Sequence, residues 1–228
     1  MTAALHGVRA AIIDLDGTML DTVPDFHVAI NRMRAEFALA PVTQEQVALM
    51  VGKGSEHLIR SVLALDYDAA GVAAHFDAAI DAYQRHYQAI NGHYSVPYRD
   101  VEAGLQALQA LGLRLACVTN KPIGFALPLL KQKGLDGYFE IVYGGDSLPK
   151  KKPDPLPLQT VCRDFELPAA QVVAIGDSSN DAQAARAAGC PVLTVPYGYN
   201  HGQAIHDTDS DGIVDTLLAA ATLIRSQN

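Results

Sequence analysis

Residues 8–21 read VRAAIIDLDGTMLD, an apolar run followed at once by acidic residues. The run of residues 8–13 has the length and composition of a buried β-strand. Asp14 and Asp16 stand two residues apart where this strand ends. Two carboxylates about 4 Å apart repel each other by about 4 kcal/mol at an effective dielectric constant near 20. The pair therefore predicts either a bound cation between the two groups or a carboxyl group that retains its proton.

Further apolar runs follow later in the chain, and segments with helical periodicity lie between them. Such runs are typical of strands that are buried on both faces, as in a parallel sheet covered by helices. The sequence thus favours an α/β fold with a Rossmann-like parallel sheet as its core. The predicted strands span residues 8–13, 113–118, 141–143, 172–175 and 192–195, and the predicted helices of this core span residues 101–111, 123–133, 154–166, 180–188 and 213–224.

The stretch between the first two predicted strands is far longer than the loops that usually connect elements of an α/β domain. Its apolar residues repeat with helical periodicity, and it has no strand-like run. We therefore expect an all-helical domain, residues 21–95, inserted into a core formed by residues 1–20 and 96–228. Asp21 is expected to cap the first inserted helix. The predicted helices of the insertion span residues 24–39, 43–50, 55–65 and 68–90.

The composition limits the partners that the protein is expected to have. The chain has 228 residues, 49% of them hydrophobic, and a formal charge of -8 from 17 Lys+Arg and 25 Asp+Glu. This acidic balance argues against nucleic acid or an anionic membrane, because both bind clustered basic side chains. Residues 1–9 lack the features of a signal peptide, and no apolar stretch has the length of a membrane span. We expect a cytoplasmic monomer or homodimer with reduced cysteines at positions 117, 162 and 190.

A second acidic loop, GDSSND at residues 176–181, follows a predicted strand and begins a helix. Ligands of open α/β sheets bind at the carboxyl ends of the strands, so this loop and Asp14 are expected to face one crevice. If the helix begins inside the loop, Asp177 and Asp181 lie on one side of its first turn. Oxygen ligands of this kind, with room for water, suit Mg²⁺. The two acidic loops together predict a magnesium site.

Two further segments supply groups that bind anions. Thr119 and Asn120 follow a predicted strand and offer a hydroxyl and backbone N–H groups at the same crevice. Residues 150–152 are three consecutive lysines before a helix, and Pro153 restrains the backbone that carries Lys152. One of these lysines, with Lys152 favoured, is expected to bind a phosphoryl group or to hold the aspartates.

These four segments, in this order, resemble the haloacid dehalogenase superfamily of phosphotransferases over nearly the full chain. The segment DLDGTMLD at residues 14–21 is similar to the first motif of the family, Thr119 to the second, Lys152 to the third and GDSSND to the fourth. The helical insertion stands where the family carries a C1-type cap. Closer similarity to bacterial phosphoglycolate phosphatases lies in VTNKP at 118–122, YGGDSLPKKKPDP at 143–155, GDSSNDAQAARAAG at 176–189 and YGYN at 197–200.

The resemblance implies Mg²⁺-dependent hydrolysis of 2-phosphoglycolate to glycolate and phosphate. Asp14 would attack phosphorus, and Asp16 would protonate the departing alkoxide and then activate the hydrolytic water. Mg²⁺ would be held by Asp14, the backbone carbonyl of Asp16 and Asp177, with Asp181 orienting these ligands or their waters from behind. The phosphoryl oxygens would be bound by Thr119, the Asn120 amide and Lys152.

The expected cap would decide which small phosphorylated metabolite enters. Residues 51–55 are a glycine-flanked segment that aligns with the substrate-specificity loop of the family, and Lys53 stands there where a neutral residue is commoner. A lysine at this place is expected to pair with the carboxylate of phosphoglycolate. A surface lysine in a mobile loop is the alternative.

Other functions share parts of this pattern. The same core is compatible with another small phosphate-ester or pyrophosphate phosphatase, or with a phosphotransferase like β-phosphoglucomutase. A phosphonoacetaldehyde hydrolase is disfavoured because that family lacks the acid at the position of Asp16. A response-regulator receiver also gathers acids, a hydroxyl and a lysine around an aspartate, but it needs no helical insertion. Residues 207–212 begin like an EF-hand loop, yet Leu218 stands at its twelfth position, so we expect a polar loop that caps the last helix.

Overall fold

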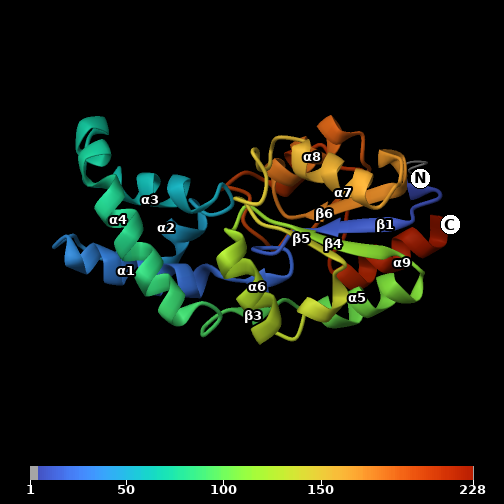
Figure 1. Ribbon diagram of the computed structural model, residues 1–228, viewed down its shortest axis with the longest axis horizontal. Coiled ribbons are helices and arrows are strands. Elements are labelled where there is room, and N and C mark those ends of the chain that lie inside the picture. The colour runs from blue at the N-terminus through green and yellow to red at the C-terminus, as the bar shows by residue number, and fades with distance from the viewer. Residues whose placement is uncertain (1–4, 228) are drawn as a thin grey trace.

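The computed structural model describes residues 5–227 and contains a six-stranded parallel sheet with helices on both faces (Figure 1). The strand order is β5-β4-β1-β6-β7-β8, and every neighbouring pair is parallel. The five predicted strands and the α/β fold are confirmed; residues 1–4 and 228 of the predicted core lie outside the described residues. The strands are β1 (Ala10–Ile13), β4 (Arg114–Val118), β5 (Ile141–Tyr143), β6 (Val172–Gly176), β7 (Val192–Thr194) and β8 (Gly212–Ile213).

The two faces of the central strand β1 explain why its sequence is apolar without alternation. Ala11 and Ile13 lie in the core between the sheet and one layer of helices, and Ala10 and Ile12 lie in the core on the opposite face. Because side chains alternate along a strand, a strand covered on both faces needs an apolar residue at every position. One layer holds α5 (Val101–Ala110), α6 (Ile123–Gln132) and α9 (Leu217–Gln227), and the other holds α7 (Leu156–Asp164) and α8 (Ser179–Ala188) (Figure 1).

The end of the chain differs from the prediction. Gly212 and Ile213 form the short strand β8 beside β7, so α9 begins four residues later than expected. The Thr216 hydroxyl accepts the N–H of Ala219 at 3.0 Å, a cap that the polar loop was expected to supply. In that loop Asp209 and Asp211 instead pair with Arg186, at 3.0 and 2.8 Å. A strand of two residues has no periodicity to detect, which is why it was missed.

Residues 23–90 form helices, as predicted, and make up the left part of Figure 1. These helices enclose an apolar core of their own, separate from the two cores of the sheet. The largest side chains in this core include Phe26, Tyr83 and Tyr87. The helices are α1 (Val23–Glu36), α2 (Gln44–Ala48), α3 (Ser55–Leu63) and α4 (Ala69–Ile90).

The helical part joins the sheet through a short antiparallel ladder. Strand β2 (Leu20–Asp21) pairs with β3 (Val96–Pro97), so the chain leaves and re-enters the sheet part at adjacent points. Helix α1 begins after Thr22 without a side-chain cap, so the prediction that Asp21 caps it is wrong. Asp21 instead accepts a hydrogen bond from the hydroxyl of Tyr199. That hydroxyl also accepts the N–H of Thr22 at 3.0 Å, so it stabilises the entry to the helical part.

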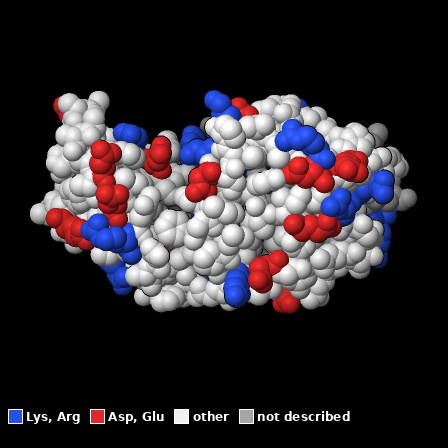
Figure 2. Space-filling model, in the orientation of Figure 1, with Lys and Arg blue, Asp and Glu red and all other residues white. Residues whose placement is uncertain are grey.

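The face of the protein in Figure 2 carries charges of both signs, and the three cysteines are buried. Figure 2 shows acidic and basic side chains interspersed over the face that it presents. Within residues 5–227, no helix combines the length and the apolar character that a membrane crossing requires. Cys117, Cys162 and Cys190 are buried and free, in agreement with the expectation of reduced core residues. The sulfur atoms of Cys162 and Cys190 are 3.7 Å apart, a proximity that the sequence did not indicate.

Candidate active site

The predicted site residues come together at the carboxyl ends of three adjacent strands. Asp14 follows β1, Thr119 follows β4 on one side of it, and Asp177 follows β6 on the other side. The chain runs from β1 to strands on both sides of it, and ligands of open α/β sheets bind where the strand order diverges in this way. The sheet therefore brings residues from distant parts of the chain to one place.

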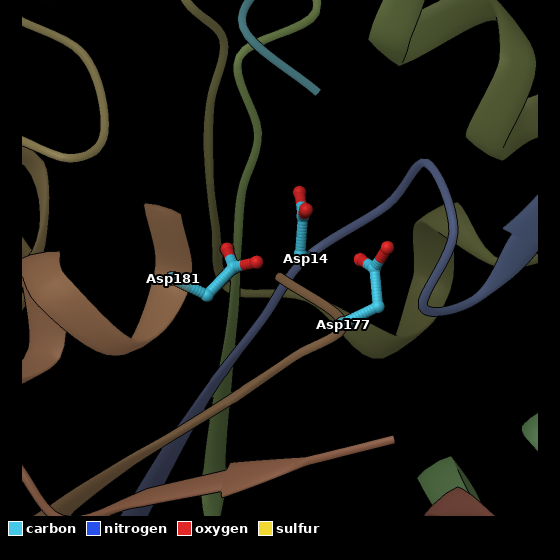
Figure 3. Close-up of side chains that lie close together, drawn as sticks. All are labelled: Asp14, Asp177 and Asp181. Carbon is cyan, nitrogen blue, oxygen red and sulfur yellow. The ribbon is translucent and has the colours of Figure 1, made fainter. Parts of the chain in front are cut away.

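Three carboxylates meet there (Figure 3). Asp14, Asp177 and Asp181 each offer one oxygen atom, and these three atoms lie within 4.8 Å of one another. Asp181 belongs to the first turn of α8, where its carboxylate accepts the N–H and the hydroxyl of Ser178 in a capping box. The start of α8 confirms that Asp177 and Asp181 lie close together. Short local structures, namely a strand end and a helix cap, thus fix the positions of all three acids.

Lys152 contacts this acidic cluster. Its Nζ lies 2.9 Å from Asp14 Oδ1 and 2.6 Å from Asp181 Oδ1, and it donates to the backbone oxygen of Val118 at 2.7 Å. The lysine side chain is 4% exposed. Burial works against its charge, but the carboxylates of Asp14 and Asp181 raise the pKa of Lys152 above its ordinary value. Lys152 is therefore placed to hold the aspartates, one of the two roles expected for a lysine of this run.

The charges of the cluster do not balance when all three carboxylates are ionised. Burial raises the pKa of Asp14 to about 7, despite the opposing effect of Lys152, and burial also raises the pKa of Asp177. Lys152 supplies one positive charge, so full ionisation of the three carboxylates would leave an excess of two negative charges, which bound protons or a divalent cation must offset. The donor set consists of carboxylate oxygens, which hard divalent cations such as Mg²⁺ prefer. The residues thus fit a divalent metal ion in both charge and chemistry.

Asp177 is held from both sides by the surrounding loops. Its Oδ1 accepts the hydroxyl of Thr18 at 2.8 Å, and its Oδ2 accepts the N–H of Tyr199 at 2.5 Å. Gly17 and Gly198 pass so close that a Cβ atom at either position would collide with the Asp177 side chain. Gly17 also has a positive φ of 88°, a conformation that favours glycine. The loop after β1 and the loop after β7 together fix this carboxylate.

Asp16 has a different partner. Its two carboxylate oxygens lie 3.1 and 3.4 Å from the Nζ of Lys121. The Lys121 side chain is only 2% exposed, and its ammonium group lies 4.4 Å from the centre of the Phe26 ring and 4.8 Å from that of Tyr87. Burial lowers the pKa of Lys121, while Asp16 works in the opposite direction. Sequence reasoning missed Lys121, although it stands within the VTNKP segment that carries the resemblance.

A pocket lies between the two parts of the molecule, above these groups. The sheet part contributes the two aspartates and residues of the loop after β4, and the helical part contributes aromatic side chains and the segment around Gly52. Its charged lining residues are Asp14, Asp16 and Lys121. The pocket thus joins an acidic floor to a mainly apolar roof, the usual composition of a small-molecule site.

Thr119 and Asn120, the two predicted phosphate-binding residues of the β4 loop, both line this pocket. The Thr119 hydroxyl accepts the N–H of Lys121 at 3.2 Å. The side-chain amide of Asn120 donates to the backbone oxygens of Gly52 and Lys152, at 2.9 and 2.8 Å. The Asn120 side chain therefore connects the helical part to the site, a role that the sequence did not suggest.

Lys53 lies elsewhere. Its side chain is exposed and lines a wider outer opening together with His57, Lys150 and Lys151. It is not among the residues that line the inner pocket within the described chain. A contact between Lys53 and the substrate therefore stays a prediction.

Comparison with known proteins agrees with this geometry. A phosphoglycolate phosphatase from Thiobacillus denitrificans is 46% identical over 217 residues, 95% of this chain and 96% of that protein. Another from Nitrosospira multiformis is 46% identical over 221 residues, 97% of each chain. The crystal structure of a predicted phosphoglycolate phosphatase from Haemophilus somnus has a TM-score of 0.89 at 30% identity, covering 98% of this chain and 99% of its own.

The match to a family covers most of the chain. Residues 11–195 match the haloacid dehalogenase-like hydrolases, a range that begins in β1 and ends just beyond β7. It includes the three acids of the cluster, both buried lysines and the helical part. The motifs, the sheet and the relatives lead to one conclusion: the chain belongs to the haloacid dehalogenase-like hydrolase family.

Proposed function

We propose that this protein is a Mg²⁺-dependent phosphatase that hydrolyses 2-phosphoglycolate to glycolate and phosphate. The observation that carries the proposal is the placement of two acids on one loop: Asp14 lies in the oxygen-rich cluster, and Asp16 faces the pocket beside Lys121. This arrangement suits a nucleophile next to a metal and an acid next to the leaving group. The choice of ester is supported by relatives named phosphoglycolate phosphatase that are 46% identical over nearly their full length.

In the first step, a carboxylate oxygen of Asp14 attacks phosphorus and the bond from phosphorus to the ester oxygen breaks. Asp16 gives its proton to that oxygen, so glycolate leaves as an alcohol. Lys152, whose Nζ is 2.9 Å from Asp14, and Thr119, which lines the pocket, stand beside the transferred group. They offset the negative charge that spreads over the phosphoryl oxygens in a loose transition state.

In the second step, Asp16 acts in the reverse direction. Now ionised, it takes a proton from a water molecule, and the oxygen of that water attacks phosphorus. The bond from phosphorus to Asp14 breaks, phosphate is released, and both aspartates return to their starting states. The same carboxyl group thus serves as general acid in the first step and as general base in the second.

Asp14, Asp177 and the backbone carbonyl of Asp16 would hold the Mg²⁺ ion. Both oxygens of Asp181 already accept hydrogen bonds, from Lys152 and from Ser178, which suits a role in orienting the ligands from behind. When bound, the ion supplies positive charge to the phosphoryl oxygens and keeps Asp14 ionised.

We infer that residues 21–95 act as a cap over the pocket. Phe26, Tyr83 and Tyr87 of this part lie over the loop that carries Asp16, where they exclude water from the transferring group. Asn120 and Asn180 both donate to the backbone oxygen of Gly52, at 2.9 and 3.3 Å. These two hydrogen bonds hold the cap loop against the catalytic loops.

Steady-state kinetics on a panel of phosphate esters tests this function. The panel contains phosphoglycolate, pyrophosphate, β-glucose 1-phosphate and p-nitrophenyl phosphate, each with and without Mg²⁺. We expect the highest kcat/KM for phosphoglycolate and little turnover without the metal. A higher kcat/KM for pyrophosphate, or conversion of glucose 1-phosphate to glucose 6-phosphate, would assign the chain to another activity of the same superfamily.

A further inference from the structure

The pocket contains a buried positive charge close to its aromatic side chains. Lys121 is the cation among the residues that line it, and the rings of Phe26 and Tyr87 flank its ammonium group. An ammonium has three N–H groups, of which the Asp16 carboxylate engages one side. Lys121 also lines the pocket in which the organic part of a substrate would lie. Lys152, the other buried lysine, has its contacts with Asp14 and Asp181 instead.

Tyr87 adds a second polar group to the same pocket. The residue is 1% exposed and lines the pocket, and its hydroxyl has no hydrogen-bond partner among residues 5–227. Buried hydroxyls are almost always paired, because an unpaired one costs about 1–3 kcal/mol. Since Tyr87 packs between Phe26 and Phe125, its ring is fixed while its hydroxyl is left without a protein acceptor. A bound anion would accept a hydrogen bond from the Tyr87 hydroxyl and pair with the ammonium group of Lys121.

The chemistry of the reaction places such an anion near Lys121. In the proposed function Asp16 protonates the ester oxygen, so this oxygen must come within hydrogen-bond distance of the Asp16 carboxylate. The carboxylate carbon of phosphoglycolate is two bonds from that oxygen. Lys121 Nζ is 3.1 Å from Asp16 Oδ1, so a carboxylate two bonds beyond the ester oxygen comes within reach of the same ammonium group.

We infer that the ammonium group of Lys121 and the hydroxyl of Tyr87 form the subsite that binds the carboxylate of the substrate. The inference rests on the proposed function and adds the residues that select a carboxylate-bearing ester over a neutral one. The exposed Lys53, in the outer opening, is the rival candidate for this role. A purely structural role of Lys121, to hold Asp16 in place, is the other alternative.

A pair of matched substrates separates these roles. The phosphate ester of glycolamide has the shape of phosphoglycolate but carries a neutral amide in place of the carboxylate. The measured quantity is the ratio of kcat/KM for phosphoglycolate to kcat/KM for the glycolamide ester. We expect Lys121→Met to lower this ratio about 100-fold and Tyr87→Phe to lower it about 10-fold, since hydrogen bonds to a buried charge contribute this much. Lys131→Met, which removes an exposed lysine of α6, should leave the ratio unchanged.

Binding measurements decide the case in which Lys121→Met turns over neither ester. Phosphoglycolate and the glycolamide ester are titrated by calorimetry into Asp14→Asn and into the double variant Asp14→Asn/Lys121→Met, both unable to form the aspartyl-phosphate. We expect the double variant to lose about 100-fold in affinity for phosphoglycolate and little for the glycolamide ester.

Three outcomes would contradict the inference. If Lys121→Met lowers kcat/KM for both esters by the same factor and the affinities fall in parallel, Lys121 only positions Asp16. If Lys53→Met lowers the ratio and Lys121→Met does not, the carboxylate is bound at the outer opening. A wild-type enzyme without any preference for phosphoglycolate would overturn the proposed substrate, and the subsite with it, before any variant is made.

Discussion

The loop after β1 has two sides that differ in charge and in lining. On one side, Asp14 shares a buried space with two more carboxylates and Lys152, and negative charge is in excess. On the other side, Asp16 has Lys121 as its partner, so the charges balance, and aromatic rings surround them. Two identical side chains, two residues apart, therefore stand in unlike electrostatic surroundings.

The difference shows how one short loop can supply two kinds of chemistry. A surplus of negative charge among oxygen ligands attracts a divalent cation, which in turn keeps a carboxylate ionised for nucleophilic attack. A carboxyl group whose oxygens are not metal ligands can instead take part in proton transfer. Residues two apart in an extended strand would point to the same face, but the chain bends at Leu15, so Asp14 and Asp16 reach different partners.

Replacing the nucleophile should have the largest effect on the first side. Asp14→Asn keeps the shape of the side chain but removes its charge and most of its nucleophilicity. We expect kcat for phosphoglycolate to fall by about 10⁴-fold or more, as in other enzymes that lose a covalent nucleophile. The thermal midpoint serves as the control for folding. Substantial activity in a folded Asp14→Asn protein would remove the aspartyl-phosphate from the mechanism.

Replacing the acid should have an effect that depends on the leaving group. Asp16→Asn is expected to lower kcat for phosphoglycolate by about 10²–10⁴-fold, the usual contribution of a general acid and base. Nitrophenolate leaves without a proton, so the first step with p-nitrophenyl phosphate should be much less affected. Rapid mixing should then show a burst of about one nitrophenolate per enzyme, followed by slow turnover. Equal loss on both esters without a burst would mean that Asp16 does not act as the acid.

Metal binding tests the excess of negative charge directly, without any substrate. A ligand at about 100 times its dissociation constant stabilises the folded state by about 2.7 kcal/mol, which for a chain of this size raises the thermal midpoint by several degrees. We expect Mg²⁺ to give such a rise in the wild type and a much smaller one in Asp177→Asn, measured by calorimetry. An equal rise in both proteins would place the bound ion outside the acidic cluster.

The same cluster predicts how metal-free stability depends on pH. The folded-state pKa of Asp14 is about 7, above its ordinary value of 3.8, so the folded protein binds an extra proton between these values. The contribution of Asp14 to the free energy of unfolding without metal should therefore rise as the pH is lowered from above 7 toward 4. Urea unfolding at pH 8 and pH 6 in a chelator measures the change, and Mg²⁺ should stabilise more at pH 8 because protons no longer compete.

The smallest effect is expected at Tyr199, which connects the acidic side to the helical part. Its backbone N–H binds Asp177, and its hydroxyl contacts Asp21, Thr22 and Val23. Tyr199→Phe leaves two backbone N–H groups without this acceptor, so we expect about 1–3 kcal/mol lower stability in urea unfolding. The matched control is Tyr94→Phe at an exposed tyrosine, which should cost less than about 0.5 kcal/mol. Equal stabilities of the two variants would show that water replaces the Tyr199 hydroxyl.

Residues that belong to local patterns were predictable from the sequence. Asp14 follows a continuous apolar run, and Asp177 and Asp181 stand where a strand turns into a helix, so both acidic loops could be placed at one edge of the sheet. The helical insertion followed from the length of chain between two strands. The lysine run identifies Lys152 as a candidate, but only its contacts with Asp14 and Asp181 distinguish between its two possible roles.

Contacts between distant segments were not predictable in this way. Lys121 is 105 residues from Asp16 in sequence, and Tyr199 is 178 residues from Asp21. The residues next to Lys121 in sequence are typical of an exposed loop. Its ammonium group is buried because Phe26 of α1 and Tyr87 of α4 pack against it. A lysine directly after the Thr119–Asn120 pair was the one available signal, since the backbone there already faces the site.

The ladder between β2 and β3 has a consequence for how the chain folds. Strands β1 and β4 are neighbours, yet the whole helical part lies between them in sequence. If the helical part folds first, the pairing of Leu20 with Pro97 joins its two ends, and β1 and β4 are already close together. Without the ladder, 100 residues separate Ile13 from Arg114; with it, residues 14–20 and 97–113 connect the two strands, which lowers the entropic cost of their pairing by about 1 kcal/mol. Folding of the inserted helices would therefore shorten the effective chain length between β1 and β4 before these strands pair.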